Sequence, residues 1–228
     1  MKEEVKSTKP WGNPKTAKVM VIGHDPALQR SQTLAEYCFF ADYYFRDKPS
    51  SVKELRKYQL AEALFTCIDD LTGGRIPKEQ ILITNLCNHQ LTRPGKGKTV
   101  FIPRKEAEQG LAQIAYFLAD SKIKLVFPMA QQVNYWLQTL GFYPIDRQFI
   151  EAAEPDSVGI DSCPAFYRPR KTGAFKYICG KRFTRYNQQS VFPILHIKNY
   201  PLKGRFKVYE QAYANCKTEV QRVIESLA

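Results

Sequence analysis

The chain has 228 residues, of which 44% are hydrophobic and 25% charged, and this composition is typical of a globular protein with a substantial core. No apolar run is long enough to span a bilayer, and the first ten residues lack the apolar stretch of a signal peptide. We therefore expect no membrane association and a cytoplasmic location. The net charge of +12 favours a polyanionic partner.

Alternating apolar and amphipathic segments predict the fold. The predicted strands are residues 18–22, 80–85, 123–128 and 191–196. The predicted helices are residues 31–45, 51–70, 103–119 and 130–139. A last helix is predicted from an apolar stripe formed by Phe206, Tyr209, Tyr213, Cys216, Val220, Val223 and Leu227. This order predicts an α/β fold, a three-layer α/β/α domain with a central, mainly parallel four-stranded sheet.

The remaining segments set the expected domain organisation. Residues 1–17 are expected to form a loosely attached N-terminal arm. Residues 18–228 are then a single domain, with an insertion of short strands and loops at about 143–190, where no regular pattern is evident. We expect the protein to be a monomer.

Three of the predicted strands are followed by polar residues. Asp25 comes two residues after Gly23, Asn85 ends the second strand, and His196 ends the fourth. Working residues of parallel α/β sheets lie just beyond the carboxyl ends of the strands, so these three side chains are expected to meet in one cleft. Taken singly, each has a structural explanation, as a turn or N-cap aspartate, a loop asparagine or a core histidine. The shared position at strand ends favours a functional site.

Three motifs in this order resemble those of the uracil-DNA glycosylase superfamily. The segment Gly23-His24-Asp25-Pro26-Ala27 resembles the family's GQDPYH, which also follows a strand. ITNLCNHQLTR, with Asn85 and Arg93, is similar to the family's second motif, an asparagine followed by leucine, threonine and arginine. His196 corresponds to the histidine of the third motif, HPSPL.

The resemblance implies a role for each matched residue. Asp25 and His196 would be catalytic, the carboxylate placing water beside the sugar and the imidazole stabilising the departing base. Asn85 would read the edge of an extruded pyrimidine, and an aromatic ring would stack on it. The expected substrate-binding residues are Gly23, His24, Pro26, Phe39 and Asn85, with Phe40 as the alternative to Phe39.

The chain also departs from the family pattern. Ala27 replaces the tyrosine that crowds the pyrimidine 5-position, which would open room for a 5-substituent or a larger base. The third motif lacks its first proline and serine, so the wedge that fills the vacated base stack could be Tyr200 or Leu202. One branch of the superfamily, the iron–sulfur glycosylases, has a cluster cysteine in a CRPP motif, and Thr92 stands at that position here. The six cysteines of the chain include no CxxC pair. We therefore expect reduced thiols, no metal and no cofactor.

Two stretches without acidic residues, 80–105 and 162–209, predict a nucleic-acid interface. The second holds eleven cations interleaved with aromatic residues, which suit phosphates and bases respectively. The cations expected to contact the strand are Arg93, Lys181, Arg182, Arg185 and Lys198. The second stretch is expected to form the wall of a positively charged groove that leads to Asp25. DNA is the expected partner, with single-stranded DNA and RNA left open.

The function predicted from these features is hydrolysis of the N-glycosidic bond of uracil or a related base in DNA. Two alternatives remain open. One is a non-catalytic nucleic-acid-binding protein that retains the glycosylase fold. The other is a hydrolase of free nucleosides, for which the basic stretches would be unnecessary. A serine or cysteine hydrolase is disfavoured because the chain has no GxSxG motif and the Cys87–His89 pair is a poor dyad signal.

Overall fold

A computed structural model describes residues 7–24, 36–46, 51–89, 91, 100–155, 170–171, 173–185 and 189–227, apart from the Arg205 side chain. The strands are β1 (Val19–Gly23), β2 (Ile81–Asn85), β3 (Leu125–Pro128), β4 (Phe183–Thr184) and β5 (Ser190–Val191). The α-helices are α1 (Val52–Thr72), α2 (Arg104–Ala119), α3 (Gln131–Thr139), α4 (Arg147–Ala153) and α5 (Glu210–Glu225). The 3-10 helices are η1 (Cys38–Phe45), η2 (Lys78–Gln80), η3 (Ala174–Tyr177), η4 (Ile197–Asn199) and η5 (Gly204–Tyr209).

The five strands form one mostly parallel sheet in the order β2-β1-β3-β5-β4, so the predicted α/β class is confirmed. Strand β1 pairs in parallel with both β2 and β3, and all of its residues are buried. Burial on both faces explains why its sequence is a continuous apolar run, without the alternation of a half-exposed strand.

The prediction of four strands was wrong, because β4 adds a fifth, antiparallel to β5. It has only two residues and lies inside the region expected to be irregular, so its sequence carries no periodic signal. The last predicted strand, 191–196, is also shorter than expected. The strand ends at Val191, although the backbone N–H groups of Phe192 and Ile194 still donate to Val126 and Pro128 of β3 at 2.9 and 3.0 Å.

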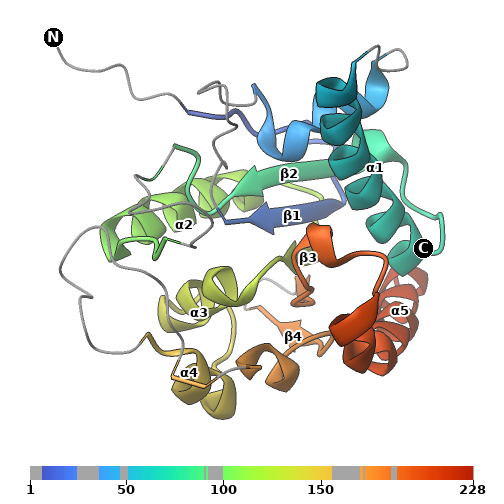
Figure 1. Ribbon diagram of the computed structural model, residues 1–228. Helices are drawn as coiled ribbons and strands as arrows, with labels where there is room; N and C mark the ends of the chain where they lie inside the picture. Colours follow the sequence, from blue (N-terminus) through green and yellow to red (C-terminus); the bar gives the residue numbers. More distant parts are fainter. Residues whose placement is uncertain are drawn as a thin grey trace, which may run out of the picture.

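The connections reverse direction across the sheet at β1. The chain leaves β1 through α1 to reach β2 on one side, then passes through α2 to β3 on the other. Right-handed connections in opposite directions place α1 and α2 on opposite faces of the sheet. In Figure 1, α1 and α5 pack together on the right and α2 and α3 on the left. The carboxyl ends of β1 and β3 therefore flank a topological switch point, where such folds bind ligands.

The described part of the predicted arm, residues 7–17, is attached closely to the domain, so the expectation of a loose arm was wrong there. Trp11 exchanges two backbone hydrogen bonds of 2.8 Å with Ile83 of β2. Its ring stacks on that of Phe45, with 5.2 Å between centroids. Because β2 is the edge of the sheet, the segment covers backbone groups that would otherwise lie unpaired.

The predicted C-terminal stripe packs as expected over its central part. Tyr213, Cys216, Val220 and Val223 are buried, whereas Leu227 at the end of the stripe is 52% exposed. Tyr213 also holds the chain beyond β5, since its Oη accepts the backbone N–H of Leu195 at 3.0 Å. None of the described helices is long and apolar enough to cross a membrane.

Candidate functional site

Gly23 and Asn85 lie side by side at the carboxyl edge of the sheet, because they are register partners at the ends of β1 and β2. The Asn85 side chain is folded over Gly23: a Cβ at position 23 would lie 2.3 Å from Asn85 Oδ1. Asn85 is only 4% exposed, yet its amide makes no hydrogen bond to another described residue. A buried amide of this kind is suited to pairing with a bound molecule.

Phe39 reaches the same point from η1. The backbone of Phe39 and Phe40 is left-handed, with φ of 55° and 56°, a conformation that costs roughly 1–2 kcal/mol for each bulky residue. The turn that results presses the Phe39 ring against Gly23, with Cε2 2.3 Å from the position of an added Cβ. Phe40 points elsewhere, edge-on to Tyr43 at 5.9 Å between ring centroids. Of the two candidate stacking residues, Phe39 is thus the one in the cluster with Gly23.

His196 completes this cluster from beyond β5. Its ring lies 5.9 Å from that of Phe39, at an interplanar angle of 43°. His196 Nδ1 accepts the backbone N–H of Lys198 at 3.2 Å. In the neutral imidazole, acceptance at Nδ1 leaves the proton on Nε2, which is then a donor. Four residues from separate segments therefore lie in one cluster, namely Gly23, Phe39, Asn85 and His196.

A pocket with a volume of 390 Å³ opens beside His196. Its walls include Gln131 at the start of α3 and the aromatic residues Phe175, Phe206 and Tyr209. The rings of Phe175 and Tyr209 are 6.3 Å apart and meet edge to face. The pocket thus offers flat apolar surfaces next to a polar ring, the environment in which an unpaired nucleobase can stack.

Asn88 holds the segment after β2 in place, and the sequence reasoning missed it. Its Oδ1 accepts the backbone N–H of Asn85 and the thiol of Cys38, both at 3.3 Å. Its Nδ2 donates to Gln113 Oε1 of α2 at 2.8 Å. Burial raises the pKa of Cys38 to about 12, so the thiol keeps its proton and acts as the donor. Asn88 thereby joins the exit of β2 to the start of η1 and to α2.

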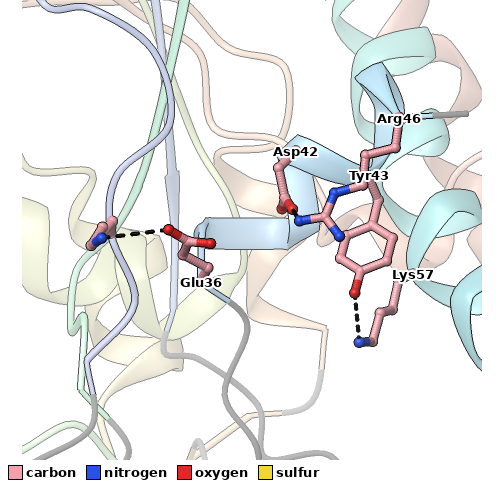
Figure 2. A network of polar contacts seen from close by, with 6 residues as sticks. Glu36, Asp42, Tyr43, Arg46 and Lys57 are labelled. Atoms are coloured by element: carbon pink, nitrogen blue, oxygen red, sulfur yellow. Dashed lines mark hydrogen bonds and ion pairs between the residues drawn. The ribbon is translucent and has the colours of Figure 1, made fainter.

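A second polar network holds η1 itself, as Figure 2 shows. The largely buried carboxylate of Asp42 forms an ion pair with Arg46. Burial raises the pKa of Asp42, and the charge of Arg46 opposes that rise. The Arg46 guanidinium lies 4.3 Å from the centre of the Tyr43 ring, and Lys57 Nζ of α1 donates to Tyr43 Oη at 2.9 Å. The network therefore ties the strained turn at Phe39 to α1.

Several predicted site residues fall outside the described part of the chain, namely Asp25, Pro26 and Arg93. The described segment ends at His24, which is 9% exposed. The carbonyls of Gly23 and His24 accept the backbone N–H groups of Leu86 and Cys87, at 2.8 and 3.0 Å. The exits of β1 and β2 are therefore held together up to the residue before Asp25.

The structure does not bring the predicted cations Lys181, Arg182 and Arg185 to this cluster. They lie on and beside the edge strand β4, which β5 and β3 separate from β1. Lys181 pairs with Asp146 at 3.1 Å, and Arg182 Nε donates to Ser190 Oγ at 3.2 Å. Arg185 covers the ring of Phe142 at 4.6 Å, and burial lowers its pKa. Lys198, by contrast, is exposed beside His196.

No protein-family model matches the chain, and no curated protein matches it. The residues and their geometry are therefore what indicates a function for this chain.

Proposed function

We propose that this protein is a DNA glycosylase that hydrolyses the N-glycosidic bond of uracil or a related base, with a uracil-DNA glycosylase-like fold. The observation that supports this most is the convergence of Gly23, Phe39, Asn85 and His196 at the carboxyl edge of the sheet. An aromatic ring, an amide and an imidazole around a backbone without a side chain provide stacking and pairing for one flat, polar base.

Base recognition falls to Phe39 and Asn85. The Phe39 ring supplies a stacking face for the extruded base, an interaction worth about 1–3 kcal/mol per base. The Asn85 amide offers one donor group and one acceptor, which match the alternating acceptor and donor on the pairing edge of uracil. Gly23 is required because any side chain there would displace both groups. Ala27, in place of the family's tyrosine, is proposed to leave room for a substituent on the base.

Bond cleavage places positive charge on the sugar and negative charge on the departing base. His196, with its Nε2 proton fixed by the bond at Nδ1, is proposed to donate toward the base oxygen. Asp25, two residues after Gly23, is proposed to stabilise the sugar cation and to orient the attacking water. The reaction consumes one water and yields the free base and an abasic site.

The strand is proposed to run past His196 along the segment 196–209. That segment flanks the 390 Å³ aromatic pocket and carries the exposed lysines Lys198, Lys203 and Lys207. None of the three forms an ion pair with a described acidic residue. Cations without internal partners beside aromatic walls are suited to phosphates and stacked bases.

The test is incubation of the purified chain with oligonucleotides that contain uracil, 5-substituted uracils or other altered bases, followed by alkali to cleave abasic sites. We expect cleavage at uracil or at a related base, in single- or double-stranded DNA. Tight binding without cleavage at any base would instead favour a non-catalytic nucleic-acid-binding protein. Cleavage of free nucleosides but not of oligonucleotides would favour the nucleoside hydrolase.

A further inference from the structure

Outside the proposed base-binding cluster, Cys87, His89 and Glu106 bring three metal-ligating groups together. Their ligand atoms all lie within 4.8 Å of one another. Cys87 Sγ is 3.7 Å from each of the two His89 ring nitrogens, and His89 Nε2 is 3.2 Å from Glu106 Oε2. Cys87 is buried, whereas the side chains of His89 and Glu106 are 30% and 24% exposed. The cluster is therefore accessible from solvent on one side.

Two of these separations are close to the edges of a zinc coordination tetrahedron. With Zn–S of about 2.3 Å and Zn–N of about 2.0–2.1 Å, tetrahedral angles separate sulfur from nitrogen by about 3.6 Å. A carboxylate oxygen on the same ion lies about 3.3–3.4 Å from the nitrogen. The observed 3.7 and 3.2 Å each differ from these values by about 0.1–0.2 Å. The third pair, Cys87 Sγ and the Glu106 carboxylate, lies within 4.8 Å, so rotation of the side chains can close the three groups around an ion.

We propose that Cys87, His89 Nε2 and Glu106 bind a Zn²⁺ ion, with water at the fourth position. Thiolate, imidazole and carboxylate are all zinc ligands, and the single thiolate disfavours Mg²⁺ and Ca²⁺. Binding releases the thiol proton of Cys87, which otherwise donates to the His89 carbonyl at 3.3 Å, to the solvent. This site differs from the sequence expectation of no metal, which rested on the lack of a CxxC pair.

The ion would fasten the segment after β2 to the first turn of α2. Cys87 and His89 come two and four residues after Asn85, and Glu106 is the third residue of α2. The Cys87 backbone N–H is bonded to the His24 carbonyl, so the ion would also brace the exit of β1. The inference does not rest on the proposed glycosylase function, because it concerns a separate set of side chains.

Cobalt substitution tests the site without any activity measurement. The full chain, stripped of metal with a chelator, is titrated with Co²⁺ while its ultraviolet and visible absorption is recorded. We expect one equivalent of Co²⁺ to give a thiolate charge-transfer band and tetrahedral ligand-field bands, and Zn²⁺ to abolish both. The charge-transfer band should be missing in Cys87→Ser. Zn²⁺ should raise the unfolding temperature of the wild type.

Glu106→Gln and Glu108→Gln are matched variants on α2, because each replaces a carboxylate with an amide of the same length and size. Glu108 is paired with Arg104 and is no part of the cluster. We expect Glu106→Gln to weaken Co²⁺ binding about tenfold or more and Glu108→Gln to leave it unchanged. A wild type without a charge-transfer band, a band that survives in Cys87→Ser, or equal effects of the two glutamine variants would overturn the proposal. The cluster would then be a hydrogen-bonded His–Glu pair beside a thiol.

Discussion

Gly23 is the residue on which the cluster at the sheet edge depends, and its replacement by alanine gives the first prediction. The added methyl would lie 2.3 Å from both Asn85 Oδ1 and the Phe39 ring, so one or both must move. We expect Gly23→Ala to lower the free energy of unfolding by about 1–3 kcal/mol. We expect excision to fall by about 10²-fold, the scale of a displacement of roughly 1 Å at a reacting group.

Gly141→Ala is the control for the contacts, because nothing lies within 4 Å of its added Cβ, although its φ of +76° makes the substitution strained by about 1–2 kcal/mol. Base excision by that variant should match the wild type. Equal loss of activity in the two variants, measured with the uracil oligonucleotide, would mean that contacts at position 23 are unimportant.

The buried thiols of Cys38 and Cys179 predict a loss of stability in alkali. Burial raises the pKa of both from 9.0 to about 12. Between these values the unfolded chain releases thiol protons that the folded chain retains, so folding is increasingly disfavoured as the pH rises. The contribution is fully present below pH 9 and is lost by about pH 12.

Unfolding temperatures measured from pH 8 to about 12 test whether stability falls in alkali as expected. The informative quantity is the difference between the Cys179→Ala variant and the wild type. The unfolding temperature of Cys179→Ala should fall less steeply with pH than that of the wild type across that range. Identical slopes of unfolding temperature against pH in the two proteins would contradict a raised pKa of the Cys179 thiol.

At the scale of the elements, α2 packs against the segment that follows β2, and Gly110 sets their separation. A Cβ at Gly110 would lie 1.7 Å from the carbonyl oxygen of Leu86, a backbone atom that cannot rotate away. We expect Gly110→Ala to cost about 3 kcal/mol, at the upper end of overpacking effects. Because Leu86 is bonded to Gly23, base binding should weaken as well.

The neighbouring Gln109 is exposed on the same helix, so Gln109→Ala is the matched control and should change the free energy of unfolding by no more than about 0.5 kcal/mol. Denaturant titration of both variants measures the effect. A Gly110→Ala protein as stable as Gln109→Ala would show that α2 can shift outward without penalty.

Elements with a strong periodic pattern were predictable, and short or strained ones were not. The predicted helix 103–119 is found as Arg104–Ala119, and 51–70 as Val52–Thr72, where Ser51 caps one end. The predicted helix 31–45 is described only from residue 36, as the 3-10 helix Cys38–Phe45. Its left-handed turn at Phe39 has no sequence signal, because two consecutive phenylalanines rarely adopt that conformation.

The residues of the candidate site were also predictable from the sequence only in part. The rule that polar residues gather at the ends of parallel strands was sufficient to select Asn85 and His196. The contact of Phe39 with Gly23 depends on the turn in η1, and the bracing role of Asn88 depends on contacts from η1 and α2. Contacts between segments far apart in the sequence leave no local pattern, so the choice of Phe39 over Phe40 and the role of Asn88 emerge only from the folded chain.

For the molecule as a whole, the +12 charge predicts that binding to DNA falls steeply with salt. The log–log slope should be roughly −0.7 to −0.9 per phosphate neutralised. Replacing Lys198, Lys203 and Lys207 with glutamine should flatten that slope by about two units or more, equally for uracil-containing and ordinary DNA.

The matched triple replaces Lys181, Arg182 and Arg185, which lie by the edge strand and have partners within the protein. The salt dependence of DNA binding should flatten less in this second triple variant than in the first. A larger effect of the second triple would place the strand along β4, as the sequence alone suggested. Binding that does not depend on salt would contradict a phosphate interface altogether.

The most direct test of the proposed active site is the single-turnover rate of uracil release by the wild type and by Asn85→Ala, with enzyme in excess over a uracil-containing oligonucleotide. Asn85 is proposed to hold the extruded base in place, and misplacement of a reacting group by roughly 1 Å typically costs about 10²-fold in rate, so we expect a fall of that size while DNA binding persists. Asn215→Ala, an exposed substitution on α5, is the control and should release uracil at the wild-type rate. Equal rates for Asn85→Ala and the wild type, or no release by the wild type from any base tested, would contradict the account.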